Sequence, residues 1–248
     1  MLGRPPDAEA EADSAGAVFD TEGGKLKAII FDMDGVLVDS EPLWQQAELA
    51  ILPKYGVPLT FEDTLKTQGL RIDQLVHYWH QRFPWQGASI EAVADELVQE
   101  VARQIRLQGR ALPGVAEAMA VVQASGLPVA LATSSPGPII DATLERLQLQ
   151  PHFQACLSAE HLAYGKPHPE VYLNAAAAID VAPERCLAIE DSFNGILAAK
   201  AARMQVLAIP DDHHRDDPRF VIADHRMDSL KQLTAPWLQQ WQQAVDAQ

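Results

Sequence analysis

The pattern of hydrophobic and polar positions divides most of this 248-residue chain into short apolar runs and longer stretches with helical periodicity. Short apolar runs bounded by turns indicate buried strands, and strands that alternate with helices are typical of a parallel sheet with crossover helices. The sequence therefore predicts an α/β fold with a Rossmann-like parallel sheet. We expect strands at residues 28–31, 129–132, 155–157, 186–189 and 206–209, and helices at residues 136–147, 167–179 and 192–202.

One segment, residues 42–110, interrupts this alternation. It offers helical patterns at residues 43–54, 73–82 and 89–107, and no strand-like run. An all-helical insertion between the first and second strands predicts a separate small cap domain. The hinges should then lie near residues 40–42 and 112–114, and residues 25–41 and 111–248 should form the core domain.

The two ends of the chain differ in character. Residues 1–24 are rich in Ala, Gly, Asp and Glu and contain one base, Arg4, so they lack the layout of a signal or transit peptide. We expect them to form a disordered acidic extension. Beyond Leu230, the helical spacing of Trp237 and Trp241 predicts a closing helix that packs on the core.

Composition and charge narrow the possible partners. A net charge of −15 argues against binding to nucleic acid or to an anionic membrane, because both would be repelled. No apolar run approaches the roughly 18 residues that span a bilayer. Cys156 and Cys186 lie in apolar runs, which favours reduced core thiols and a cytoplasmic protein over a disulfide or a metal site. We expect a monomer.

The first candidate for chemistry is the run Asp32-Met33-Asp34-Gly35, directly after the first predicted strand. An aspartate can attack phosphorus when a divalent cation shields its charge, and we assign Asp32 this role. Asp34 points to the same side of an extended chain, so it can protonate a leaving oxygen and later accept a proton from water. The alternatives are a polar turn or a calcium loop, and the position of Gly35 does not fit an EF-hand.

Three further groups of residues follow predicted strands, and the carboxyl ends of parallel strands meet in one crevice. Thr133 and Ser134 precede a helix, where hydroxyls and amides bind phosphate or merely cap the helix. Lys166 precedes a proline-started helix and can neutralise a phosphoryl group, or it is a solvated loop lysine. The adjacent carboxylates Glu190 and Asp191 suggest a magnesium site shared with Asp32.

The order and placement of these four motifs resemble the haloacid dehalogenase superfamily of phosphotransferases, from about Lys25 to the C-terminus. The resemblance implies that Asp32 is the nucleophile, Asp34 the general acid and base, Thr133 the phosphate-binding hydroxyl and Lys166 the charge-balancing lysine. It also implies Mg²⁺, or Mn²⁺ or Co²⁺ in its place. The implied ligands are the Asp32 carboxylate, the Asp34 backbone carbonyl and Asp191, with Glu190 close by or acting through water.

Further segments resemble the sugar-phosphate phosphatases of this superfamily. They include FDMDGVLVDSEPLW from Phe31, QGLRID from Gln68, KPHPEVY from Lys166 and EDSFNG from Glu190. This similarity implies a Mg²⁺-dependent phosphatase of small sugar and sugar-alcohol phosphates, such as 2-deoxyglucose 6-phosphate, sorbitol 6-phosphate and mannitol 1-phosphate. Gly165, just before the lysine, is a local departure from the pattern.

Other functions remain open from the residues alone. A sugar phosphomutase of the β-phosphoglucomutase type would use the same groups and return the phosphoryl group to sugar. A catalytically idle protein that binds a sugar phosphate would keep the fold without turnover. A dehalogenase would leave Asp34 unexplained, because that reaction has no leaving oxygen to protonate. In the cap loop, Arg71 could reach the crevice and grip substrate hydroxyls.

Overall fold

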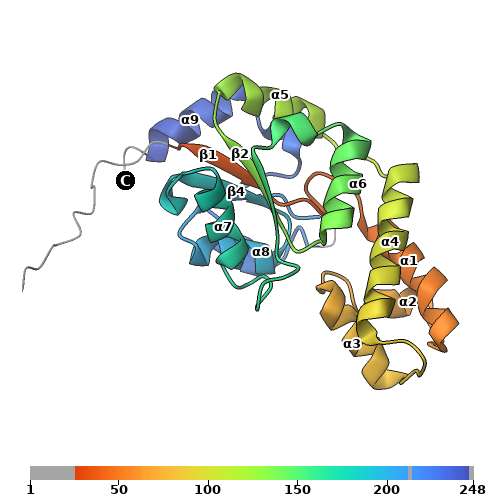
Figure 1. Ribbon diagram of the computed structural model, residues 1–248. Helices are drawn as coiled ribbons and strands as arrows, with labels where there is room; N and C mark the ends of the chain where they lie inside the picture. The colour runs from red at the N-terminus through yellow and green to blue at the C-terminus, as the bar shows by residue number, and fades with distance from the viewer. Residues whose placement is uncertain (1–25, 212–213, 246–248) are drawn as a thin grey trace, which may run out of the picture.

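The computed structural model describes residues 26–211 and 214–245, and its core is a six-stranded sheet in which all paired neighbours are parallel (Figure 1). The strand order is β3-β2-β1-β4-β5-β6, so β1, the first of the described strands, lies inside the sheet. Ligands of such open sheets bind outside the carboxyl ends of the strands. The strands are β1 (Ala28–Phe31), β2 (Val129–Thr133), β3 (Ala155–Ser158), β4 (Cys186–Glu190), β5 (Gln205–Ala208) and β6 (His225–Arg226).

The two faces of the sheet carry side chains of different size. On one face, Ile29 and Leu131 belong to a cluster of large apolar side chains that includes residues of α5 (Val115–Ser125) and α6 (Gly137–Leu147). On the other face, strand alanines pack with the alanine-rich helices α7 (Glu170–Ala178) and α8 (Phe193–Ala201). Small residues on both partners allow a close approach of helix to sheet. Figure 1 shows the two pairs of helices on opposite sides of the sheet.

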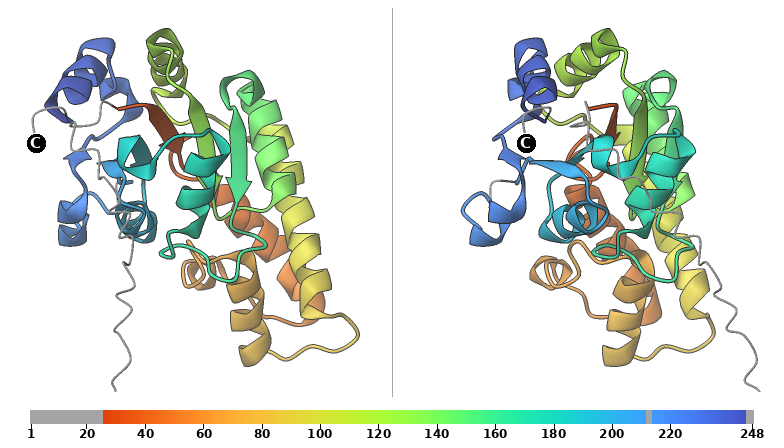
Figure 2. Two further views of the ribbon diagram at one scale, coloured as in Figure 1. Left: turned by 60° about the vertical axis from the view of Figure 1, so that its left-hand side comes forward. Right: turned by 90° about the vertical axis from the view of Figure 1, so that its left-hand side faces the viewer.

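Between β1 and β2 the chain forms helices that pack on one another, and we call residues 42–110 the cap. In the views of Figure 2 the orange part of the cap lies beyond one end of the sheet, and its yellow helix runs from there to the core. The two connecting segments run side by side, since the Asp39 amide donates to the Arg110 carbonyl at 3.1 Å and the Leu112 amide to Leu37 at 3.1 Å. The cap helices are α1 (Glu41–Ile51), α2 (Phe61–Thr64), α3 (Ile72–Arg82) and α4 (Ile90–Gln108).

Helix α4 joins the cap to the core. Its start is fixed by Ser89, whose hydroxyl accepts a hydrogen bond from the Ala92 amide at 3.1 Å. Buried residues at helical spacing, such as Val93, Leu97 and Val101, form one face. The helix contacts α1 and α3 within the cap and α6 in the core. Trp79 and Trp85 of the cap are buried in the large apolar cluster.

Most predicted strands and helices are confirmed, and the differences lie at their ends. The helix expected from residue 167 begins at Glu170, because residues 165–168 form a turn in which the His168 amide donates to the Gly165 carbonyl at 3.0 Å. The helices α2 and α5 and the strand β6 were not expected from the sequence. The final helix, α9 (Ala235–Val245), begins after a short 3₁₀ turn at Leu230–Gln232.

The prediction that both cysteines are core thiols is wrong for Cys156. It is exposed, because β3 is the edge strand of the sheet, whereas Cys186 of β4 is buried. Burial raises the pKa of the Cys186 thiol to about 12. Trp237 packs partly buried against the core cluster, while the side chain of Trp241 and the predicted extension at residues 1–24 lie outside the described residues. Among the described helices, none has the length and apolar character needed to cross a bilayer.

Candidate active site

Asp32 lies just past the end of β1, at the carboxyl edge of the sheet. Its amide donates to the Ile189 carbonyl of β4 at 2.9 Å, so the strand pairing continues to this residue and fixes its backbone. The side chain is buried, and burial raises the pKa of Asp32 to about 8, although Lys166 lowers it; Glu190 and Asp34 raise it further. A buried carboxylate at this edge needs a cation close by in order to ionise.

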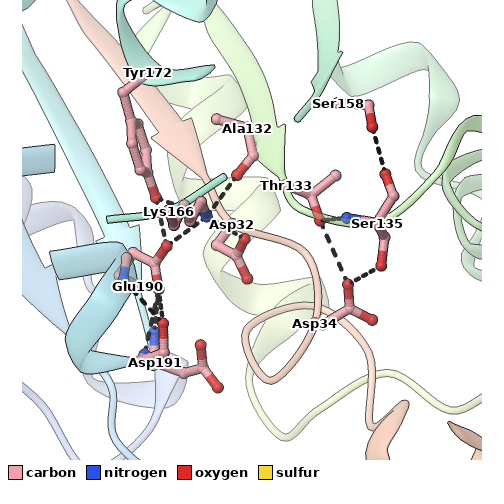
Figure 3. A network of polar contacts seen from close by, with 12 residues as sticks. Asp32, Asp34, Ala132, Thr133, Ser135, Ser158, Lys166, Tyr172, Glu190 and Asp191 are labelled. Atoms are coloured by element: carbon pink, nitrogen blue, oxygen red, sulfur yellow. Dashed lines mark hydrogen bonds and ion pairs between the residues drawn. The ribbon is translucent and has the colours of Figure 1, made fainter. Parts of the chain in front are cut away.

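Lys166 supplies one such cation. Its Nζ atom contacts Asp32 Oδ1 at 2.6 Å, Glu190 Oε1 at 2.6 Å and the Ala132 carbonyl of β2 at 3.0 Å (Figure 3). Burial lowers the pKa of Lys166, but Asp32 and Glu190 outweigh that effect and hold the pKa above its usual value. The side chain is only 7% exposed, so Lys166 is not a solvated loop lysine. It is charged and held in one position beside the predicted nucleophile.

Glu190 is the most completely hydrogen-bonded carboxylate of the site. Its Oε1 atom accepts from Lys166 and from the Tyr172 hydroxyl at 2.7 Å, and Oε2 accepts from the Asp191 amide and from the amide and hydroxyl of Ser192. The residue is fully buried. A Cβ atom at Gly195 would lie 1.8 Å from Oε1, so only glycine leaves room for this carboxylate. Glu190 therefore fastens Lys166 to the start of α8.

Asp191 packs against the turn that follows Asp34. A Cβ atom at Gly35 would lie 1.9 Å from Asp191 Oδ2, and Gly35 has φ +77°, a backbone conformation that side chains rarely adopt. Burial, together with Glu190 and Asp32, raises the pKa of Asp191 well above its usual value. Glycine at residue 35 thus allows the Asp191 carboxylate to pack on the backbone of the turn that follows Asp34.

The acidic cluster fits a divalent cation. Ligand atoms of Asp32, Glu190 and Asp191 all lie within 4.8 Å of one another. When all three carboxylates are ionised, they and the one lysine carry a net charge of −2, which is costly to bury unless a cation of charge +2 balances it. Carboxylate oxygens are the donors that Mg²⁺ prefers. Because the oxygens of Glu190 already accept five hydrogen bonds, Asp32 and Asp191 have more capacity to bind a metal directly.

Hydroxyl groups orient the second aspartate. Asp34 Oδ1 accepts from the Ser40 hydroxyl at 2.5 Å, and Oδ2 accepts from the Ser135 hydroxyl at 2.7 Å and the Thr133 hydroxyl at 3.4 Å. Thr133 Oγ1 also accepts from the Ser135 amide at 3.0 Å. The hydroxyl predicted to bind phosphate therefore holds Asp34 here. Ser134, which we also predicted to bind substrate, is half-buried in the same loop.

Sequence reasoning missed four residues of this site. Ser40 and Ser135 hold Asp34, and Tyr172 supports Glu190. Glu41, the first residue of α1, is partly buried, and burial raises its pKa to about 7, with Asp34 adding to the effect and Gln45 opposing it. A serine before a helix or a tyrosine within one carries no chemical signal of its own. Glu41 follows Ser40 directly, and its closeness to Asp34 depends on how the chain enters the cap.

Arg71 lies at the boundary between cap and core. Its guanidinium group binds Asp73 and two backbone carbonyls of the loop after β3. Among the described residues, the hydrogen bonds of Arg71 go to Asp73 and these carbonyls, and not to Lys166 or Asp34. Its predicted role in binding substrate hydroxyls stays a prediction.

The sequence of this chain is similar to those of several known phosphatases. The model of the haloacid dehalogenase-like hydrolases matches residues 26–203, which is more than half of the chain. The chain belongs to this family. Hexitol phosphatase B of Escherichia coli K12 is 44% identical over 212 residues, which cover 85% of this chain and 96% of that protein. The phosphorylated carbohydrates phosphatase of Thermotoga maritima is 32% identical and covers 73% of this chain and 83% of its own length.

Solved structures agree with the family in fold. The crystal structure of CbbY from Rhodobacter sphaeroides in complex with phosphate has a TM-score of 0.76 and 27% identity, and covers 84% of this chain and 96% of that one. The predicted superfamily, the predicted α/β fold and the predicted class of enzyme, a phosphatase, are confirmed. In this chain, side chains at the ends of β1, β2 and β4 lie close together, since Lys166 bonds to Asp32 and Glu190, and Thr133 to Asp34.

Proposed function

We propose that this haloacid dehalogenase-like hydrolase is a Mg²⁺-dependent phosphatase of small sugar and sugar-alcohol phosphates. The observation that carries the proposal is the buried contact of 2.6 Å between Asp32 and Lys166, next to the carboxylate of Asp191. A carboxylate that is desolvated, held by one cation and open to a second is suited to attack phosphorus. We also expect the enzyme to act in the cytoplasm as a monomer, with no nucleic acid or membrane partner.

In the proposed reaction, Asp32 attacks phosphorus and forms an aspartyl-phosphate, while the bond to the leaving alkoxide breaks. Asp34 donates a proton to that alkoxide and then takes one from water, whose oxygen attacks the aspartyl-phosphate and releases inorganic phosphate. Lys166 orients Asp32 and neutralises part of the phosphoryl charge. Ser40 and Ser135 keep the Asp34 carboxylate at a fixed place beside the loop that ends β2.

The residues that would hold Mg²⁺ are Asp32 and Asp191, with the Asp34 carbonyl as the third ligand that the family resemblance implies. Support comes from the charge of −2 that three ionised carboxylates and one lysine carry, and from the close packing of Asp191 on Gly35. A bound Mg²⁺, or Mn²⁺ or Co²⁺ in its place, would neutralise charge on the phosphoryl oxygens. Without such an ion, burial keeps the pKa of Asp32 raised and disfavours the ionised nucleophile.

The substrate class rests on the relatives and on the cap. Hexitol phosphatase B and the phosphorylated carbohydrates phosphatase are both named for phosphorylated carbohydrates, and the match to the first covers nearly its whole length. A cap over the carboxyl edge of the sheet favours a small ester that it can enclose. We therefore expect 2-deoxyglucose 6-phosphate, sorbitol 6-phosphate and mannitol 1-phosphate among its substrates.

The test is a measurement of inorganic phosphate released from these three esters, with and without Mg²⁺. We expect metal-dependent release by the wild-type enzyme and by Asp141→Asn, an exposed change on α6, and almost none by Asp32→Asn. Absence of metal-dependent release from every ester would refute the proposal. A coupled assay for glucose 1-phosphate to glucose 6-phosphate conversion distinguishes the mutase: conversion without free phosphate would favour a β-phosphoglucomutase-type activity instead.

A further inference from the structure

Arg71 connects the cap to the core through two kinds of contact. Within the cap, its Nε and Nη2 atoms bind Asp73 Oδ1 and Oδ2, both at 2.7 Å, in a bidentate ion pair. Across to the core, Nη1 donates to the carbonyls of Leu162 at 2.9 Å and Ala159 at 3.2 Å. The side chain is 15% exposed, whereas that of Asp73 is 48% exposed. One partly buried guanidinium therefore joins the cap to the loop that follows β3.

The core carbonyls belong to the loop of residues 159–165, which connects β3 to Lys166. Its first residue is tied to the end of β2, the strand next to β3, because the Ala159 amide donates to the Thr133 carbonyl at 2.9 Å. Its last residue, Gly165, is bonded covalently to Lys166. Movement of this loop would therefore reach both the predicted phosphate-binding hydroxyl and the charge-balancing lysine.

Gly165 makes room for this contact. A Cβ atom at that position would lie 3.4 Å from Arg71 Cδ and 3.9 Å from its Nε and Nη1 atoms. The arginine side chain thus lies directly along the loop, and a residue larger than alanine would meet it. This contact gives a physical reason for the glycine that departs from the sequence pattern before Lys166.

We propose that Arg71 is a positioning residue that fastens the cap to loop 159–165 and so couples cap closure to the placement of Lys166. The bidentate pair with Asp73 sets the plane of the guanidinium, so that Nη1 points at the two carbonyls. The N–H groups of Nη1 donate to backbone carbonyls of the core, and not to a substrate. The kinetic part of this inference rests on the proposed phosphatase function, and its structural part does not.

The structural test is hydrogen–deuterium exchange of the intact protein for Arg71→Met and for Arg103→Met. Arg103 is the matched control, because it also makes a bidentate pair within the cap, with Glu100, and is more exposed. We expect the amides of residues 159–166 and of His168 to exchange about tenfold to a hundredfold faster in Arg71→Met, as the loss of charge-assisted hydrogen bonds implies. Arg103→Met should leave these amides unchanged, and equal exchange in all three proteins would overturn the inference.

The kinetic test compares a sugar phosphate with acetyl phosphate, which has no sugar hydroxyls. If Arg71 places the loop, Arg71→Met lowers kcat for both substrates, the sugar ester and the acyl phosphate, by a similar factor, about tenfold or more, and Arg71→Lys restores part of the loss. A rise in KM for the sugar ester alone, with acetyl phosphate unaffected, would show that Arg71 grips substrate and would overturn the inference. Faster exchange in a protein that hydrolyses neither substrate would uphold the structural part and reject the phosphatase.

A double-mutant cycle checks the role of Gly165. Gly165→Val should speed exchange of the loop amides in the wild-type background, because the added side chain meets Arg71. In the Arg71→Ala background, which removes the Cδ atom nearest to residue 165, the same change should have a smaller effect. Additive effects in the two backgrounds would contradict the proposed packing of Arg71 along the loop.

Discussion

The cap contains a buried carboxyl group that gives a strong prediction for stability. Glu48 of α1 is 2% exposed, and its Oε2 atom accepts hydrogen bonds from the Thr67 hydroxyl at 2.8 Å and the Trp79 indole at 3.2 Å. Burial raises the pKa of Glu48 from 4.5 to about 7, although both hydrogen bonds lower it and Glu41 raises it slightly. The folded cap therefore favours the protonated carboxyl group.

Proton binding to Glu48 sets the direction in which the free energy of unfolding changes with pH. Between the unfolded pKa of 4.5 and the folded value of about 7, the folded protein holds more protons on Glu48 than the unfolded chain does. The free energy of unfolding therefore falls as pH rises through this window and levels off above it. At 1.36 kcal/mol per pKa unit, the shift corresponds to a loss of ~3 kcal/mol.

The perturbation is Glu48→Gln, which removes the ionisation and keeps the size of the side chain. Urea unfolding followed by tryptophan fluorescence at about pH 5 and about pH 8 gives the two free energies. We expect wild type to lose ~2 kcal/mol or more on going to the higher pH relative to Glu48→Gln, and Glu62→Gln, an exposed change in the same domain, to behave as wild type does. If wild type and Glu48→Gln lose stability equally, the buried carboxyl group is not the cause and the reasoning fails.

Four further substitutions probe the site. Lys166→Met should abolish phosphate release and cost ~3–5 kcal/mol in metal-free urea unfolding, because it leaves buried carboxylates without their cation. Gly195→Ala should cost ~1–3 kcal/mol in the same assay, since its Cβ would overlap the Glu190 carboxylate. Tyr172→Phe, which removes one hydrogen bond to that carboxylate, should cost ~1.5–3 kcal/mol and leave the circular dichroism spectrum unchanged. Asp191→Asn should weaken Mg²⁺ binding in calorimetry by about tenfold or more, and unchanged binding would exclude Asp191 as a ligand.

The parts of the fold that the sequence predicts well are those in which one physical signal dominates. The strands β1, β2 and β4 are largely continuous apolar runs, as is typical of parallel strands that are buried on both faces. The end of a strand is harder to place. Cys156 sits in a similar apolar run, but it is exposed because β3 has a neighbour on one side only. Whether a strand is central or at the edge depends on the order of the whole sheet.

The start of α7 is another feature that local sequence signals do not place correctly. Proline at residue 167 is a common first residue of a helix, which made a start there plausible. The chain instead uses residues 165–168 for a turn closed by His168 and Gly165, and the helix begins after a second proline. That turn brings Lys166 to the acidic cluster, so a requirement of the site overrides the local signal.

The candidate site shows why residue type predicts chemistry better than it predicts the partner of each group. Asp32, Lys166 and Asp191 could be named from the sequence because strand ends converge in this fold. The serines that hold Asp34 could not, since their hydroxyls gain a role only when the cap connection and the loop after β2 meet. The same holds for Glu190: its carboxylate looks like a metal ligand in the sequence, yet five donors already occupy it.

These contacts assign different roles to the two adjacent carboxylates that follow β4. Glu190 points toward Lys166 and Tyr172 (Figure 3), whereas Asp191 packs on the backbone of Gly35. A shorter side chain at residue 190 would release Lys166, and a longer one at residue 191 would meet the turn. The order Glu then Asp is therefore required by the packing on each side. Exchanging the two residues should abolish activity although composition and charge are unchanged.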